Sequence, residues 1–412
     1  MMVRKRTWTL LVVVMVIIGG LVASGSLANA SPVQRADGIS YASQADEAAL
    51  YLNDMVFVRD TVTLPAGQVR VLLPPGTYAD TLILTENDTR VHNYRMTAQT
   101  AEVYYSQAAF RYGGSSSYMP GGTAYILTWD SPEANADAEV RSIKLEYMMS
   151  GASWTPTYDM RIVNESTVDL AFFAKVTNSS LMLDEATVFL VAGRVDLSQQ
   201  MDHVSQVTMN QYAVGYAEST VELPTLGVGA VELQHIYPLG ALSAEPGDTV
   251  YSNLVDETFS ARRLLVWNAS AEPEVDVIYK VTNSTEVPLA EGIVRVFQDN
   301  LFMGSDFIET TPSGSEGSVT VGSLPDVRVR RTASEEYHGQ ANDYYLHSVT
   351  LEINNFSDDE IALIVLDRWE ESAWQFEYSL TPERQQDNLL RWEVSIPAGE
   401  SLTITYQYRT EY

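Results

Sequence analysis

Alternation of apolar and polar residues is the feature that most constrains the fold of this chain. Near the C-terminus the alternating apolar residues are Leu402, Ile404, Tyr406 and Tyr408, with polar residues between them. The same period of two runs through residues 143–147, 349–353 and 392–396. Side chains of a strand point alternately to its two faces, so each segment is predicted to have one face on a core and one in water. This pattern is typical of antiparallel sheets. Helix is expected only at residues 43–50, as one or two turns at most.

A six-residue segment occurs almost twice. Residues 175–180 read Lys-Val-Thr-Asn-Ser-Ser, and residues 280–285 read Lys-Val-Thr-Asn-Ser-Thr. Each copy lies between two apolar runs, although the flanking spacings differ. We interpret the copies as two similar hairpins in neighbouring β modules, with Asn178 and Asn283 at their turns.

A shorter repeated sequence predicts two further turns. Residues 64–68 and 396–400 both contain Pro-Ala-Gly and lead into a predicted strand. Proline followed by glycine two positions later favours a tight turn, because glycine readily takes a positive φ. The whole pattern predicts an all-β protein of two or three antiparallel β-sandwich modules of the immunoglobulin-like kind. Their expected bounds are 31–149, 150–260 with a long polar loop at 196–231, and 261–412.

The N-terminus has the layout of a secretory signal. Basic residues at 4–6 precede an apolar run at 10–22 and an Ala-Asn-Ala sequence at 28–30. This predicts a signal peptide over residues 1–30. The alternative is an uncleaved anchor, in which residues 8–23 contact the membrane. Both interpretations place the body outside the cytoplasm, so we expect a secreted, periplasmic or cell-surface protein.

Composition excludes several classes of site and partner. The chain of 412 residues has no cysteine, which excludes disulfides, thiolate metal sites and cysteine nucleophiles. It has 54 acidic and 25 basic residues, a net charge of −29. Nucleic acid is therefore not an expected partner, and anionic lipid is a poor one. We expect an envelope glycan or an envelope protein as partner, and no cofactor.

Two aromatic residues are candidates for ligand binding. Trp154 and Tyr158 flank Pro156 and could form a platform for a glycan or a peptide. The alternative is that both rings pack at a domain junction, where Pro156 shapes an edge strand.

An acidic run and the histidines are the candidates for a metal site. Asp358, Asp359 and Glu360 offer the oxygen ligands that Ca²⁺ prefers, but they lack the spacing of a calcium loop. We favour a solvated turn. The five histidines show no pair at helical spacing and no His-Glu-x-x-His, so a zinc site is not predicted.

Six Asn-x-Ser/Thr sequences are candidate sites of N-glycosylation. They begin at Asn87, Asn164, Asn178, Asn268, Asn283 and Asn355. The alternative is turn chemistry, because an asparagine side chain readily bonds to nearby backbone where a strand ends.

Arg328, Arg330 and Arg331 form a basic cluster in the predicted third module. Alternation puts Arg328 and Arg330 on one outward strand face. We expect them to protect a sheet edge or to meet an acidic loop of a partner.

Several segments, taken in order, resemble a known family. They are residues 151–158 (GASWTPTY), 191–195 (VAGRV), 232–239 (ELQHIYPL), 288–296 (PLAEGIVRV) and 304–308 (GSDFI). Over roughly residues 51–412 the chain resembles the conserved domain of unknown function of mucoidy-inhibitor-A-like proteins, in a short form without the coiled-coil insert. The resemblance implies an envelope-facing all-β protein, and it supplies no catalytic residues.

These observations favour a non-enzymatic function. We expect an exported cell-envelope scaffold or binding protein. The alternative is a hydrolase that acts on envelope polysaccharide through a carboxylate pair in a cleft between modules. A deep groove with two such carboxylates, one of them in apolar surroundings, would favour the enzyme.

Overall fold

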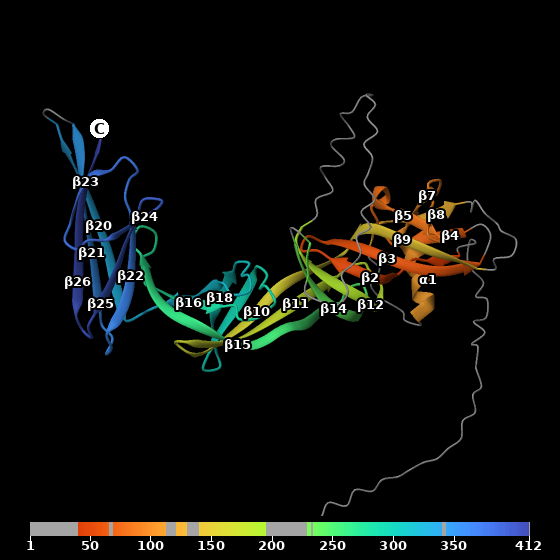
Figure 1. Ribbon diagram of the computed structural model, residues 1–412, viewed down its shortest axis with the longest axis horizontal. Helices are drawn as coiled ribbons and strands as arrows, with labels where there is room; N and C mark the ends of the chain where they lie inside the picture. Colours follow the sequence, from red (N-terminus) through yellow and green to blue (C-terminus); the bar gives the residue numbers. More distant parts are fainter. Residues whose placement is uncertain are drawn as a thin grey trace, which may run out of the picture.

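The computed structural model describes residues 40–65, 69–112, 121–129, 140–194, 229–231, 234–339 and 343–411. The predicted signal segment and most of the predicted loop at 196–231 lie outside these residues. The described part is all-β and elongated, with the C-terminal module set at an angle to the rest (Figure 1). Among the described residues, no helix has the length and apolar character needed to span a bilayer.

The N-terminal module contains two sheets. The four-stranded sheet has the order β1 (Tyr41–Ala42), β4 (Val69–Leu73), β8 (Thr123–Trp129), β7 (Arg95–Thr100). The eight-stranded sheet has the order β13 (Gly229–Val231), β14 (Gln234–Ala244), β12 (Leu183–Ala192), β2 (Ala45–Leu50), β3 (Met55–Pro65), β9 (Val140–Ser150), β5 (Ile83–Glu86), β6 (Thr89–Arg90). A 3₁₀ turn covers Ala79–Thr81 and helix α1 covers Ala101–Tyr112.

Helix α1 and strand β2 correct the helix prediction. The expected helical turns at 43–50 are wrong, because Ala45–Leu50 pairs as a strand between β12 and β3. Helix α1 was not predicted. It is held by Tyr104 and Tyr105, which pack in a small core with Leu72 and Ile126. Tertiary contacts outweigh weak local propensity in both segments.

The rest of the chain forms a ten-stranded sheet and a four-stranded sheet. The first has the order β18 (Leu301–Ile308), β17 (Gly292–Gln298), β10 (Ala152–Asn164), β11 (Thr167–Asn178), β15 (Thr249–Asn268), β22 (Ile361–Arg368), β25 (Leu389–Ile396), β24 (Glu383–Gln385), with β16 (Asp276–Thr282) on β15 and β19 (Glu316–Ser323) on β16. The second has the order β20 (Val327–His338), β21 (Tyr344–Asn355), β26 (Ser401–Glu411), β23 (Trp374–Tyr378).

Strand β15 joins the middle module, which contains β10, β11 and β16 to β19, to the C-terminal module. Its 20 residues pair with β11 in the first part and with β16 and β22 in the second. The expected boundary at 260/261 therefore falls inside one continuous strand. A separate C-terminal core begins only at Leu265, between β22 and β25 on one side and β21 and β26 on the other.

One order of strand pairing occurs three times. A strand that ends at or next to an asparagine pairs antiparallel with a later strand, as β11 with β15, β16 with β19, and β21 with β26. Parallel pairs then link successive units, as β10 with β17 and β15 with β22. The repeated sequence segment thus belongs to a threefold structural repeat.

A buried asparagine ends the first strand of each unit. Asn178, Asn283 and Asn355 follow or end β11, β16 and β21, and each is at most 1% exposed. Their Nδ2 atoms donate to carbonyls of their own corner, namely Leu181 at 2.6 Å, Val287 at 2.9 Å and Asp359 at 2.8 Å. The same atoms also donate to a second loop, at the carbonyls of Glu245, Thr311 and Pro397. Each amide therefore fastens two loops together.

These corners correct the hairpin interpretation. After Asn178 the chain leaves the sheet of β11 and enters the sheet of β12; after Asn283 it passes from β16 to β17. Neither following strand pairs with the strand before the corner. The second loop at each corner contains a proline and a glycine, and the glycines have φ of 99°, 78° and 69° at Gly247, Gly314 and Gly399. Of the two predicted Pro-Ala-Gly turns, the one at 396–400 forms the second loop of the corner at Asn355.

Candidate functional site

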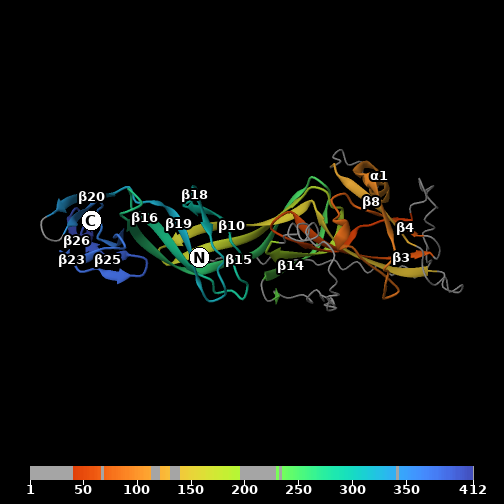
Figure 2. The ribbon, with the colours of Figure 1, turned by 90° about the horizontal axis from the view of Figure 1, so that it is seen from above.

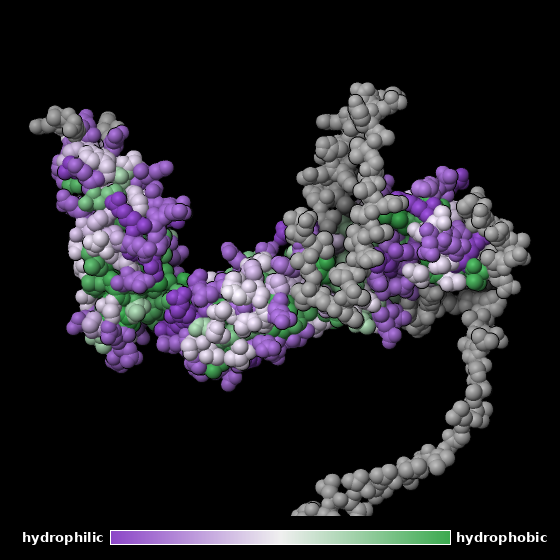
Figure 3. All heavy atoms as spheres, viewed as in Figure 1, coloured by the Kyte–Doolittle hydropathy of each residue, from purple (hydrophilic) through white to green (hydrophobic). Residues whose placement is uncertain are grey.

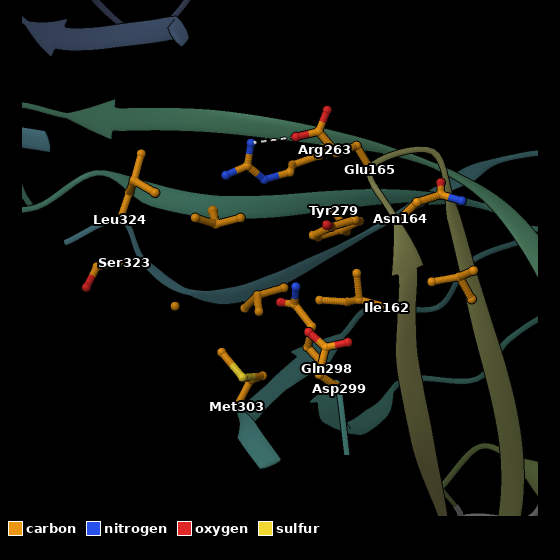
Figure 4. Close-up of a pocket in the computed structure, with 14 residues that line it drawn as sticks. Ile162, Asn164, Glu165, Arg263, Tyr279, Gln298, Asp299, Met303, Ser323 and Leu324 are labelled. Carbon is orange, nitrogen blue, oxygen red and sulfur yellow. Dashed lines mark hydrogen bonds and ion pairs between the residues drawn. The ribbon is translucent and has the colours of Figure 1, made fainter. Parts of the chain in front are cut away.

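A cavity opens where the middle and C-terminal modules meet. Its volume is about 490 Å³, a size that suits a small ligand or a side-chain cluster of a partner. It lies at the end of β10, beneath β15 and β16, and between the β17–β18 turn and the end of β19 (Figure 4). Its lining residues run from position 162 to position 324 and come from six strands, so it forms only when these strands are assembled.

The cavity has an apolar wall and a polar rim. Ile162, Val277, Val321 and Leu324 line the wall together with the buried ring of Tyr279. Burial raises the pKa of the Tyr279 phenol, and the positive charge of Arg263 opposes this effect. The phenol is therefore neutral at physiological pH and can act as a hydrogen-bond donor or acceptor for a ligand.

The rim carries one ion pair, two side-chain amides and a second carboxylate. Arg263 Nη1 donates to Glu165 Oε1 at 3.1 Å (Figure 4). Asn164, Gln298 and Asp299 complete the rim. The Glu165 side chain is 78% exposed. Such exposure does not supply the apolar surroundings that a general acid needs.

The β17–β18 hairpin presents apolar side chains beside the cavity. Asp299 and Asn300 have positive φ and form its tight turn. Directly after the turn, Leu301, Phe302 and Met303 are 66%, 61% and 47% exposed. On the outer sheet face Phe302 packs against Phe297, and further along the hairpin Ile293 faces Phe307, both 52% exposed.

This concentration of exposed apolar side chains differs from its surroundings. Figure 3 shows a mainly hydrophilic face, on which apolar residues gather on the C-terminal module beside its junction with the middle module. Three consecutive exposed apolar residues on one strand are costly in water unless something covers them. The hairpin and the cavity together form the candidate binding site.

The predicted aromatic platform is not on the surface. Trp154 and Tyr158 are 0% exposed. Trp154 Nε1 donates to the carbonyl of Val191 at 2.9 Å, and the Tyr158 hydroxyl donates to the carbonyl of Ala290 at 2.6 Å. A ligand cannot reach either ring, so the platform prediction is wrong and the packing alternative describes both residues.

The six Asn-x-Ser/Thr sequences separate into two groups. At Asn178, Asn283 and Asn355 the amide nitrogen is buried and already donates to carbonyls, so it cannot carry a glycan in this fold. Asn87 and Asn164 are exposed and Asn268 is half-buried. Glycosylation of these three stays a prediction.

The acidic run lies at the third asparagine corner. Asp358, Asp359 and Glu360 are exposed, and the backbone carbonyl of Asp359 accepts hydrogen bonds from Asn355 and Ser357. Among the described residues, no group of three or more His, Asp or Glu side chains could hold a metal ion. The acidic run is therefore part of the third asparagine corner, where the Asp359 carbonyl accepts hydrogen bonds that hold the fold.

Sequence reasoning missed the cavity and the hairpin. A run of three apolar residues behind Asp299-Asn300 is a signal that could have found the hairpin, because such a turn precedes a strand whose two faces would both be apolar. No local signal marks the cavity, since its walls come from segments far apart in the chain.

The chain matches a family of known proteins. A family model described as Domain of unknown function (DUF4139) matches residues 143–412, from within β9 to the end of the chain. No curated protein matches. The matched part holds the three repeated units, the cavity and the hairpin. Since it covers more than half of the chain, the protein belongs to the family described as Domain of unknown function (DUF4139).

Proposed function

We propose that this protein is an exported, non-enzymatic scaffold or binding protein of the cell envelope, and that it binds its partner at the β17–β18 hairpin and the adjoining cavity. The observation that carries the proposal is the exposed apolar hairpin. The basic, apolar and Ala-x-Ala layout of residues 1–30 supports export. The resemblance to mucoidy-inhibitor-A-like proteins supports an envelope location.

The connection of the modules supports a scaffold. Strand β15 runs without interruption from the middle module into the C-terminal module, so bending between them would break strand pairing. A rigid, elongated molecule holds its binding surface at a fixed distance from its ends. A partner bound at the hairpin would therefore be held at a defined place.

The hydrolase alternative has less support at this site. The carboxylates that line the cavity are Glu165 and Asp299, both exposed, and Glu165 is paired with Arg263. The buried carboxylates of the described residues lie elsewhere. Those of Asp60, Glu86 and Asp367 each bond to different protein groups and do not face one another.

Cross-linking in the native envelope tests the proposal. The tagged full chain is cross-linked in cells, purified, and its bound proteins and glycans are identified. Phe302→Ser combined with Phe307→Ser is expected to lower the amount of captured partner about tenfold or more, because two exposed aromatic contacts are lost.

Phe356→Ser is the matched control. Phe356 is an equally exposed phenylalanine on the C-terminal module, at 65%. If the control variant loses the partner as much as the hairpin variant does, the hairpin is not the binding surface. If Glu165→Gln or Asp299→Asn abolishes release of sugars from isolated envelope polysaccharide, the protein is a hydrolase.

A further inference from the structure

The C-terminal module has a long unpaired sheet edge. Strand β20 pairs with β21 over its whole length of 12 residues, and no other described strand pairs with its second side. In Figure 2 it lies along the margin of the C-terminal module. Residues 332–337 are all exposed. An edge of this length is a template for another strand unless side chains prevent pairing.

The charges on this edge change sign along the strand. Arg328, Arg330 and Arg331 lie in its first half, and Glu335 and Glu336 lie in its second half. Charges of one sign would repel any second copy and protect the edge. Opposite signs at the two ends instead complement an identical strand that runs in the other direction.

We propose that β20 pairs with β20 of a second copy of this chain, antiparallel, about a twofold axis at Ala333. In this register Arg330 faces the partner's Glu336, and Arg331 faces the partner's Glu335. Val329 faces the partner's Tyr337. Directly opposite residues of an antiparallel pair lie on the same face, so these pairs meet side by side.

The pairing would give a continuous eight-stranded sheet with the order β23-β26-β21-β20 and its symmetric continuation. A twofold contact of this kind is isologous, so it closes and does not continue into a fibre. The contact is centred on Ala333, whose side chain is small and exposed. Two copies can therefore approach there without a clash of side chains.

Existing contacts leave the required side chains accessible. Arg330 Nε bonds to Glu352 at 2.7 Å, but the Arg330 side chain is still 70% exposed. Glu336 is 75% exposed and Glu335 is 56% exposed. Arg331 lies on the other face of the strand and turns inward to Asp367, so it contributes less to the contact.

A single cysteine tests the register directly. The chain has no cysteine, so Ala333→Cys introduces a single thiol. Opposite Cα atoms in an antiparallel pair are about 4.5–5.5 Å apart, within the range that a disulfide spans. The full-length variant is expected to form a disulfide-linked dimer under mild oxidation.

Ala362→Cys is the matched control, because Ala362 is exposed on β22 but β22 is paired on both sides. It is expected to form no disulfide-linked dimer at the same protein concentration, because Ala362 does not lie at the proposed contact. Equal cross-linking of the two variants overturns the proposal, as does a monomeric Ala333→Cys variant.

A charge swap provides a second test without a covalent bond. Arg330→Glu and Glu336→Arg are each expected to raise the dimer dissociation constant about tenfold, because each turns two attractive pairs into repulsive ones. The variant with both changes restores the complementarity and should dimerise like the parent. Light scattering after size exclusion measures the dimer, and thermal melting confirms that each variant is folded. Failure of the double variant to recover overturns the register.

Discussion

The N-terminal and C-terminal modules each bury an aspartate, and they stabilise it in different ways. Asp60 on β3 and Asp367 on β22 are both 0% exposed. Asp60 accepts hydrogen bonds from Ser43 Oγ at 2.6 Å, the Gln44 amide at 3.0 Å and the Tyr41 hydroxyl at 2.9 Å. None of its described partners is a cation. Asp367 instead bonds to Arg331 Nε at 2.9 Å and to the Tyr406 hydroxyl at 2.7 Å.

The two ways of stabilising the buried aspartate shift different pKa values. Desolvation raises the pKa of Asp60 to about 6, although its hydrogen bonds oppose the shift. In the C-terminal module burial alone would lower the pKa of Arg331, but the charge and hydrogen bonds of Asp367 outweigh it and raise that pKa. Burial without a packed cation therefore raises the pKa of Asp60 and makes the stability of the N-terminal module depend on pH.

Removal of the Arg331 cation should have the largest effect on the free energy of unfolding. Arg331→Met leaves the Asp367 carboxylate buried without its counter-ion, and we expect the free energy of unfolding to fall by about 3 kcal/mol at pH 7. Urea denaturation measures the loss. The matched control is Arg330→Met, since Arg330 is the next residue and pairs with Glu352 on the surface. A similar loss in both variants would remove the distinction between the two aspartates.

Asp60→Asn should remove a pH dependence. The pKa of Asp60 in the folded protein is about 6, against an ordinary value of 3.8, so the native state holds the proton more tightly. The resulting stabilisation is fully present below about pH 4 and is lost as the pH rises through 6. This shift of about two pKa units corresponds to about 3 kcal/mol in the free energy of unfolding.

The measurement is the free energy of unfolding of parent and variant from pH 4 to pH 8. The parent is expected to lose stability relative to Asp60→Asn by up to about 3 kcal/mol over this range. Asp80→Asn, an exposed aspartate of the same module, should leave the parent profile unchanged. Parallel profiles for the parent and Asp60→Asn would show that Asp60 does not titrate between these values.

The two tyrosine donors should give the smallest effects. Tyr406→Phe removes a fully buried donor to a charged group and is expected to cost about 2 kcal/mol. Tyr41→Phe removes a part-buried donor and is expected to cost about 1 kcal/mol at pH 8. It should also move the pH midpoint of Asp60 upward, because that hydrogen bond favours the ionised form. Equal costs, with no shift of the midpoint, would contradict the comparison.

The strand faces were readable from the sequence. In β26 the apolar residues Ile404, Tyr406 and Tyr408 are buried while Thr403 and Thr405 are exposed, as alternation predicts. The all-β class follows from this local rule. Helix α1 escaped detection because the two tyrosines that hold it are buried by strands far away in the chain.

The asparagine corners were only partly readable. The repeated Lys-Val-Thr-Asn-Ser located Asn178 and Asn283 correctly at strand ends, since a short amide bonds to backbone where a strand stops. The third corner at Asn355 shares only Asn-x-Ser/Thr with them, so the repeated segment did not mark it. Its structural role depends on the carbonyl of Pro397, 42 residues away.

By itself, the sequence determined the β class, the inward and outward faces of the strands, and the ends of β11 and β16. These depend on neighbours within a few residues, where side-chain direction and backbone bonding are local. The tertiary structure alone decided which strands pair, where the cavity and the exposed hairpin lie, and which buried aspartate has a cation. Arg331 reaches Asp367 across 36 residues of sequence, and both desolvation and charge depend on what packs nearby in space.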